Sequence, residues 1–401
     1  MRRAISFVSI AAVLLVVSTP AYARPYWKRQ IDRIAANKNI GIALHDEGRI
    51  LYRHDDRHQR VPASNEKLLM SMALFDVLPP ETTIETRAFA TAAPIAGVLS
   101  GDLWLTGRGD PSITGGGRYT SLPFRATRLS ALARAIDDEI DVVEGRILGN
   151  SGYFDDDWFA PGWKSDFPER EIPLPSALSF EGNVDAGKHV KNPQWRAARA
   201  LKNKLEKLGV AVTGTAGSGR MPRSVSLLAS IESQPLSVLV RFMNRWSSNF
   251  FAEVLGKRLG VEHSGGLGTI AKGASAIEAF AQRLGVSVTA YDASGLSYAN
   301  RAAPVGIVKL LTHVEEETTY YEPLRDGLAA GGQGTLENRL HDVTMRAKTG
   351  SLDGVSALSG WVWLERAASW AEFSILSTGM SYYEAKGVED RIVRLIEERA
   401  S

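Results

Sequence analysis

Two side chains that could perform chemistry together, Ser64 and Lys67, lie three residues apart, directly after Pro62-Ala63. If a helix begins at this point, both side chains lie on one helix face, one turn apart, and the amine can reach the hydroxyl. A serine in a first helical turn is also polarised by the unpaired backbone N–H groups there. The pair therefore predicts a nucleophile, Ser64, whose proton is taken by Lys67 acting as a base.

A lysine acts as a base only if its pKa falls from the ordinary value of about 10.4. Burial of the amine and a second cation nearby would both lower the pKa of Lys67. Lys348, at the end of a predicted strand over residues 343–348, is the cation that we expect beside it.

A second string, Ser247-Ser248-Asn249, precedes Phe250-Phe251 and predicts another helix start. We expect the Ser247 hydroxyl to relay a proton to a departing amine. The Asn249 amide, which carries both a donor and an acceptor, is expected to orient the substrate backbone.

The third string begins with Lys348 and suits a substrate that ends in a free carboxylate. The cation of Lys348 and the hydroxyls of Thr349 and Ser351 would hold that carboxylate, and Gly350 would leave room for the substrate along the strand. The backbone N–H groups of Ser64 and Ser351 are expected to form the oxyanion hole.

Each string taken alone also fits a structural role: two helix caps and an edge-strand lysine before a turn. The occurrence of all three in order favours a catalytic site. Rival motifs are incomplete. No glycine directly precedes Lys348, as a P-loop requires, and residues 292–296 lack both glycines of G-x-S-x-G.

The first residues predict export. Arg2 and Arg3 are followed by an apolar run over residues 5–17 and by Ala21-Tyr22-Ala23, which is typical of a signal peptide cleaved after residue 23. We therefore expect a periplasmic protein without an integral membrane anchor; an uncleaved N-terminal anchor is the alternative.

The 401-residue chain has 47 Lys and Arg against 45 Asp and Glu, and the predicted signal contains two of the arginines and no acid. The remaining chain is formally neutral, which argues against nucleic acid as a partner. It has no cysteine, and its seven histidines are scattered. We therefore expect neither thiol catalysis nor a metal site nor a cofactor.

Hydrophobic patterning places strands near both ends of the chain and helices between them. It predicts a hairpin over 40–44 and 50–52, later strands at 343–348, 358–364 and 371–376, and helices at 236–245, 250–259, 270–284 and 388–400. This is an α+β fold, an antiparallel sheet covered by helices.

Residues 79–235 have a different texture, with short β-type runs, frequent Gly and Pro, and one predicted helix over about 121–136. They predict a strand-rich inserted domain. The expected organisation is a signal peptide (1–23), a main domain in two parts (24–78 and 236–401), and the insert (79–235).

With these strings on the page, the chain resembles the low-molecular-mass class C penicillin-binding proteins, the D-alanyl-D-alanine carboxypeptidases and endopeptidases of penicillin-binding protein 4 type. The resemblance extends over nearly the whole exported chain and includes several further strings: Leu103 to Pro111, Asp292 to Ser297, Gly334-Thr335-Leu336, Arg346 to Gly350 and Val355 to Gly360.

The resemblance implies a transpeptidase/β-lactamase-like domain and a serine DD-carboxypeptidase/DD-endopeptidase. Such enzymes cleave D-Ala-D-Ala termini or cross-links of peptidoglycan stem peptides through an acyl-serine, here acyl-Ser64, and β-lactam antibiotics inhibit them. The family roles fall on the residues named above: Ser64, Lys67, Ser247, Asn249 and Lys348 in catalysis, and Thr349, Gly350 and Ser351 in substrate binding.

Two more substrate-binding residues are implied by the resemblance. Asp166, after Gly162-Trp163, resembles the family's acid for the side-chain amine of the stem peptide; a solvated loop acid is the alternative. Family members tend to carry an arginine after the S-G-L-S string, whereas this chain has Tyr298 there and Arg301 three positions later.

Two other functions are compatible with the fold. A β-lactamase needs a carboxylate that activates water for deacylation, and we find no E-x-x-x-N loop to supply it. A non-catalytic peptidoglycan-binding protein is the second alternative, although every key residue of the three strings is intact.

Overall fold

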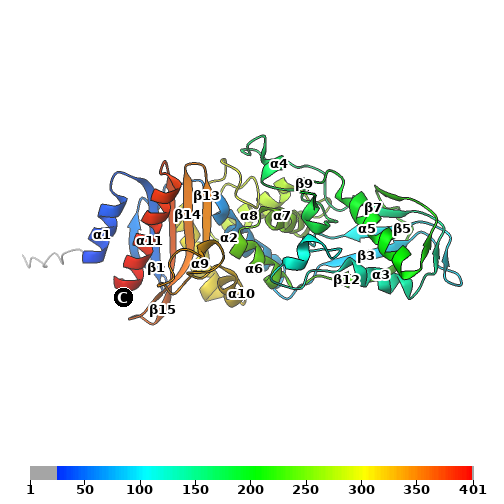
Figure 1. Ribbon diagram of the computed structural model, residues 1–401. Helices are drawn as coiled ribbons and strands as arrows, with labels where there is room; N and C mark the ends of the chain where they lie inside the picture. The colour runs from blue at the N-terminus through cyan, green and yellow to red at the C-terminus, as the bar shows by residue number, and fades with distance from the viewer. Residues whose placement is uncertain (1–24, 400–401) are drawn as a thin grey trace, which may run out of the picture.

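The computed structural model describes residues 25–399, so the predicted export signal lies outside the described residues. Over this range we find no helix whose length and apolar content would let it cross a bilayer. The predicted α+β class is confirmed: antiparallel strands pair into a sheet, and helices pack on it (Figure 1).

The main sheet is antiparallel and has the strand order β13-β14-β15-β1-β2. Its strands come from both ends of the chain: β1 (Asn39–Asp46), β2 (Arg49–His54), β13 (Met345–Leu352), β14 (Val355–Leu364) and β15 (Ser369–Thr378). β14 is buried along almost its whole length, as is typical of a central strand that is covered on both faces.

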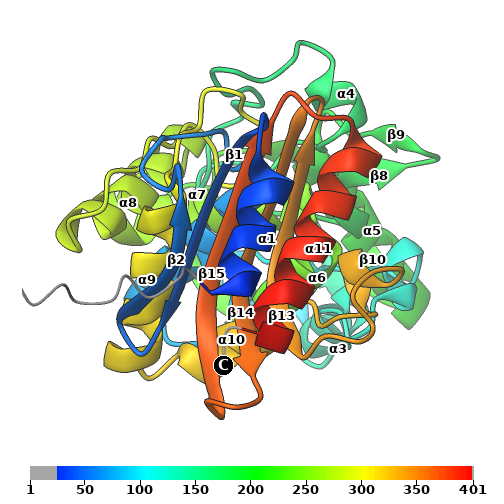
Figure 2. The ribbon, with the colours of Figure 1, turned by 90° about the vertical axis from the view of Figure 1, so that its left-hand side faces the viewer.

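Helices cover both faces of this sheet. α1 (Tyr26–Ala35) and α11 (Tyr382–Arg399) lie side by side on one face (Figure 2), where Ile392, Val393 and Ile396 of α11 are buried. The other face is covered by a set of six helices: α2 (Glu66–Val77), α6 (Leu236–Trp246), α7 (Asn249–Ser264), α8 (Ile270–Arg283), α9 (Pro304–Glu317) and α10 (Tyr321–Gly327).

Within this set α2 is the central helix. Residues 66–75 are all buried, so the helix has no solvent-facing side over this stretch. It contacts α6, α7 and α8. The start of α2 therefore lies deep in the molecule, and Lys67 with it.

Residues 85–232 form a second sheet with a core of its own, at the end of the molecule away from α1 (Figure 1). The strand order is β11-β7-β5-β3-β12, with β7 parallel to β5 and β11 and the other neighbours antiparallel. The strands are β3 (Glu85–Ala90), β5 (Leu103–Gly107), β7 (Ile147–Asn150), β11 (Ala216–Gly219) and β12 (Ser226–Glu232).

The smaller elements of this part are a three-stranded parallel sheet, a two-stranded hairpin and three helices. They are β4 (Val98–Leu99), β6 (Val142–Val143), β10 (Ala211–Val212), β8 (Val184–Asp185), β9 (Lys188–His189), α3 (Leu129–Asp137), α4 (Phe167–Arg170) and α5 (Pro193–Leu208).

The prediction of one helix in this part was wrong. The predicted helix is shorter, because residues 118–121 form a 3-10 turn and α3 begins at Leu129. The longer helix, α5, was missed because its buried Ala197, Leu201 and Leu205 are separated by lysines and arginines. α9 and α10 were also not predicted.

Candidate active site

Ser64 lies in a single 3-10 turn, η1 (Ala63–Asn65), that leads into α2, as the sequence predicted. Ala63 has a left-handed backbone, with φ 47°, which costs about 1–3 kcal/mol in a non-glycine residue and is kept only where neighbours enforce it. One such neighbour is β13: the buried Asn65 side chain donates from Nδ2 to the Lys348 carbonyl at 2.9 Å.

Two glycines allow the chain to close around this turn. A Cβ at Gly350 would lie 3.0 Å from the Pro62 carbonyl oxygen and 3.1 Å from the Ser64 nitrogen. A Cβ at Gly295 would lie 1.9 Å from the Ala63 carbonyl oxygen. The room predicted at Gly350 for a substrate is therefore used by the backbone that carries Ser64.

The Lys67 amine makes three hydrogen bonds. Nζ lies 3.0 Å from Ser64 Oγ, 2.8 Å from Asn249 Oδ1 and 2.5 Å from the Ser294 carbonyl oxygen. The side chain is fully buried. The predicted contact between amine and hydroxyl is thus present.

Burial lowers the pKa of Lys67 to about 8, although the nearby carboxyls of Asp292, Glu253 and Glu66 raise it. We expected Lys348 to lower the pKa of Lys67, but the effect between the two cations is found on Lys348. Burial, followed by the charge of Lys67, lowers the pKa of Lys348 well below its ordinary value. Burial is what lowers the pKa of Lys67, and the carboxyls beside it act in the opposite direction.

Lys348 is fully buried beside Ser247. Its Nζ donates to Ser247 Oγ at 2.9 Å and to the Thr349 carbonyl at 2.8 Å. Ser247 ends α6 with a left-handed backbone, φ 54°, while Ser248 caps α7 by accepting from the Phe251 N–H at 3.3 Å. The predicted helix cap is therefore Ser248, and the hydroxyl of Ser247 is left for the cleft.

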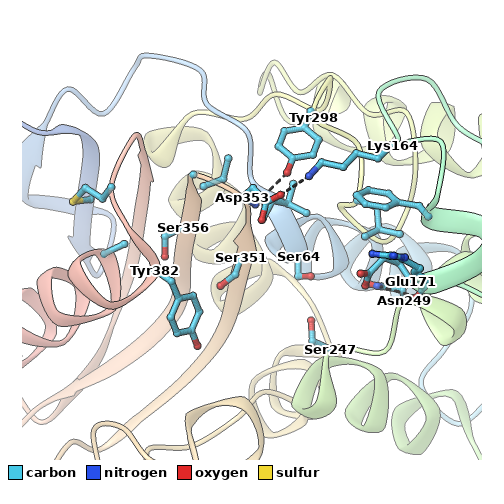
Figure 3. Close-up of a pocket in the computed structure, with 18 of the residues that line it drawn as sticks. Ser64, Lys164, Glu171, Ser247, Asn249, Tyr298, Ser351, Asp353, Ser356 and Tyr382 are labelled. Carbon is cyan, nitrogen blue, oxygen red and sulfur yellow. Dashed lines mark hydrogen bonds and ion pairs between the residues drawn. The ribbon is translucent and has the colours of Figure 1, made fainter.

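Of the five residues proposed for catalysis, Ser64, Ser247 and Asn249 line a cleft of about 660 Å³. Lys67 and Lys348 are buried behind them and are hydrogen-bonded to them. Figure 3 shows Ser64 between Ser351 on one side and Asn249 on the other, with Ser247 below it. The start of α11 and β13–β14 form one wall, and α4 from the insert forms the opposite wall.

The predicted carboxylate-binding residues are placed differently from one another. Ser351 lines the cleft and is exposed. Thr349 is buried and does not line the cleft, because its Oγ1 lies 2.8 Å from Thr335 Oγ1 in the 334–336 turn.

Asp166 and Tyr298, for which substrate binding was predicted, both line the cleft. Asp166 directly precedes α4 and lies 3.6 Å from the guanidinium of Arg170, in a partly exposed ion pair. The Tyr298 hydroxyl accepts from the Asp353 N–H at 3.1 Å. Arg301 does not line the cleft, since its guanidinium donates to the backbone carbonyls of Tyr298 and Asn300.

Sequence reasoning missed the cation that does lie beside Tyr298. Lys164, from the insert, forms an ion pair with Asp353 and lies 5.5 Å from the Tyr298 ring centre (Figure 3). Glu171 was also missed; it lines the cleft, and its carbonyl accepts from Asn249 Nδ2 at 3.4 Å.

Three buried acids behind Lys67 were missed as well. Asp292 accepts hydrogen bonds from the Trp163 indole and from its own loop, whereas Glu253 accepts from the next two residues of that loop. Burial raises the pKa of Glu66 well above its ordinary value, and neither of its side-chain oxygens has a hydrogen-bond partner among residues 25–399. The D-A-S-G-L-S string was the only sequence signal for this region.

Known proteins match this chain along most of its length. A profile of the D-Ala-D-Ala carboxypeptidase 3 (S13) family matches residues 29–188 and 181–399. The D-alanyl-D-alanine carboxypeptidase of Actinomadura sp. (strain R39) is 28% identical over 442 residues, which cover 87% of this chain and 79% of that protein.

The fold is also similar to a solved structure, penicillin binding protein 4 from Haemophilus influenzae. The two have a TM-score of 0.76 at 19% identity, covering 92% of this chain and 97% of that one. A second structure of the Haemophilus protein, complexed with a β-lactam, has a TM-score of 0.71 over the same shares of the two chains.

Proposed function

The chain belongs to the D-Ala-D-Ala carboxypeptidase 3 (S13) family and is a serine D-Ala-D-Ala peptidase, and from this premise we propose a role for each cleft residue. Ser64 is the nucleophile and Lys67 its base. The observation that supports this most directly is the 3.0 Å hydrogen bond between Ser64 Oγ and the buried amine of Lys67.

In acylation, Ser64 Oγ attacks the carbonyl carbon of the D-Ala-D-Ala bond while its proton passes to neutral Lys67. With a pKa of about 8, roughly one Lys67 in ten is neutral at pH 7. The backbone N–H groups of Ser64 and Ser351 stabilise the oxyanion, and each such donor is worth roughly 3–4 kcal/mol.

Collapse of the tetrahedral intermediate breaks the C–N bond. Ser247 donates its hydroxyl proton to the leaving amine and is reprotonated from Lys348, to which it is already hydrogen-bonded. Free D-Ala, or the amine end of a cross-link, departs and acyl-Ser64 remains. Water then hydrolyses this ester by the reverse proton path.

The substrate is held on both sides of the scissile bond. Lys348 and Ser351 receive the terminal carboxylate, with Thr349 fixing the strand through Thr335; the carboxylate would raise the pKa of Lys348 again, because an opposite charge favours the ammonium form. Asp166 and Tyr298 form the pocket for the side chain of the stem peptide.

The setting follows from these roles. We infer that the natural substrates are peptidoglycan stem peptides, that β-lactams acylate Ser64, and that the protein works in the periplasm after loss of residues 1–23. The insert (79–235) brings Lys164 and Asp166 to the cleft formed by the main domain (24–78 and 236–401). The β-lactam complex of the Haemophilus relative supports the inhibitor assignment.

Labelled penicillin tests the nucleophile. We expect the wild-type protein to form one long-lived adduct and Ser64→Ala to form none. Ser381→Ala, which changes another serine that lines the cleft, should label normally. A labelled Ser64→Ala protein would refute the assignment, and rapid release of hydrolysed penicillin would favour a β-lactamase.

Digestion of a monomeric pentapeptide and a cross-linked dimer, with products read by mass, then measures the carboxypeptidase and endopeptidase activities.

A further inference from the structure

The Lys67 amine has one neighbour that can donate a hydrogen bond to it and two that cannot. Asn249 Oδ1 and the Ser294 carbonyl oxygen only accept, whereas the Ser64 hydroxyl can do both. A neutral amine has two N–H bonds and one lone pair. If the two N–H groups point at the carbonyl oxygens, the lone pair is left facing the hydrogen of Ser64.

This arrangement depends on where the Ser294 carbonyl is held. Ser294 belongs to the 292–297 loop, which crosses beneath the Ser64 turn at Gly295. The loop is fastened to α7 by Glu253, whose Oε1 accepts from the Ala293 N–H at 2.9 Å and from the Ser294 N–H at 2.7 Å. Glu253 is fully buried.

Helix α7 thus supports both acceptors of Lys67. Asn249 and Glu253 are four residues apart and share one face of the helix. Asn249 supplies the first acceptor with its own side chain, and Glu253 places the second through the loop backbone. Movement of either one would change the direction of the Lys67 lone pair.

The charge of Glu253 fits this task. Burial raises the pKa of Glu253 to about 8, so the neutral acid prevails at pH 7. Its other oxygen, Oε2, has no hydrogen-bond partner within residues 25–399. Ionisation of Glu253 as the pH rises towards 8 raises the pKa of Lys67 and limits the fall that burial causes, whereas at pH 7 most of Glu253 is neutral.

We propose that Glu253 is a positioning residue for acylation: by holding the backbone of Ala293 and Ser294, it keeps the Ser294 carbonyl on the Lys67 amine and directs the amine's lone pair at Ser64. The inference rests on the proposed role of Lys67 as the base. Glu253 touches neither substrate nor Ser64 and acts through the loop.

The test is the pH profile of the acylation rate with labelled penicillin, from pH 5.5 to 9.5. In Glu253→Ala we expect the loop to loosen and water to reach Lys67. Because burial is the largest cause acting on the pKa of this lysine, its loss should outweigh the loss of the charge of Glu253, which raises that pKa, and the midpoint of the profile should rise by at least one pH unit. The rate at pH 7 should fall by at least tenfold.

Two variants serve as comparisons. Glu253→Gln keeps an oxygen that accepts both N–H groups and removes a charge that raises the pKa of Lys67, so its midpoint should not rise. Glu278→Ala removes a similar contact at the start of the same region, where Glu278 Oε1 accepts from the Ala290 N–H at 2.9 Å, and its profile should be unchanged. If Glu253→Ala fails to fold, Glu253→Asp, whose carboxylate is one methylene short of the loop, should show the shift instead.

The proposal is overturned if a folded Glu253→Ala or Glu253→Asp protein keeps the wild-type midpoint and loses only thermal stability. It is equally overturned if Glu253→Gln behaves like Glu253→Ala, since charge rather than the acceptor would then matter. These outcomes differ from failure of the proposed function, in which the wild-type protein would not label or Ser64→Ala would.

Discussion

In the proposed mechanism, the reactivity of this cleft depends on the protonation of one side chain, Lys67. The proton-accepting role that an imidazole with its carboxylate has in a Ser-His-Asp triad falls here to a buried amine. Burial supplies the fall in pKa to about 8, and the three acids nearby limit that fall. The same burial that makes Lys67 a base therefore sets the pH at which it becomes one.

We expect the acylation rate to rise with pH. Because the neutral amine is the active form and the pKa of Lys67 is about 8, the rate should increase about tenfold per unit below pH 8 and level off above it. Stopped-flow measurement with a chromogenic β-lactam gives this profile. Lys67→Arg, which stays protonated, should lose acylation across the whole range. A rate that does not change between pH 6 and pH 8 would remove Lys67 as the base.

At this scale the sequence predicted the residues that the structure brings together and missed their supports. Ser64, Lys67, Ser247, Asn249 and Lys348 lie in short strings with characteristic spacing, and the structure brings all five together. The supports have no such spacing. Glu253 and Lys164, for example, act through a loop backbone and through an ion pair that only the folded chain forms.

Among the secondary-structure elements, the approach of β13 to η1 determines the geometry of the cleft. β13 reaches the turn through Gly350, and the Asn65 side chain fixes the distance by its bond to the Lys348 carbonyl. The strand and the turn therefore form one unit, which holds the nucleophile in register with Ser351.

Gly350→Ala should move β13 away from η1. The new Cβ would lie 3.0 Å from the Pro62 oxygen and 3.1 Å from the Ser64 nitrogen, so the strand must move by a few tenths of an ångström. We expect a loss of about 1–3 kcal/mol in the free energy of unfolding and a larger proportional loss of acylation. Urea unfolding and penicillin labelling measure the two.

The matched control is Gly387→Ala in α11, where an added Cβ meets nothing within 4 Å. This helix position should gain up to about 1 kcal/mol and keep full labelling. If Gly350→Ala labels as fast as Gly387→Ala, the tight approach of the strand has no catalytic role.

Elements with a clear apolar period were predicted well, and those without one were not. α6, α7 and α8 begin within one residue of their predicted starts, and the first hairpin is present. α5 was not predicted, because lysines and arginines separate its buried apolar residues. α11 begins at Tyr382 rather than at 388, because its exposed first turn carries no apolar pattern.

For the molecule as a whole, the cleft depends on how the insert is joined to the helices. Lys257 on α7 is fully buried, and its Nζ donates to Asp155 Oδ1 at 2.7 Å and to the carbonyls of Asp155 and Asp157 at 3.1 and 3.0 Å. This contact holds residues 155–157, which precede Lys164 and Asp166 of the cleft in the same segment of the chain.

Lys257→Met should loosen that segment. Loss of the charged hydrogen bonds is expected to lower the free energy of unfolding by about 1.5–3 kcal/mol, measured by urea unfolding. Lys202→Met, which removes a surface i,i+4 pair with Glu206 on α5, should cost only about 0.3–0.5 kcal/mol. Equal losses in the two variants would show that Lys257 contributes no more than a surface charge.

The pairing of β1 with β15 has a consequence for the order of events during synthesis. Asn39 lies opposite Thr378, and the bond from Asn65 to the Lys348 carbonyl spans 283 positions of the chain. A ribosome that has released the segment with Ser64 has not yet made the strand against which that serine is fixed. If Ser64 is the nucleophile, as we propose, the growing polypeptide therefore stays inert towards acyl donors, and reactivity begins only when the last hairpin has been made and has docked.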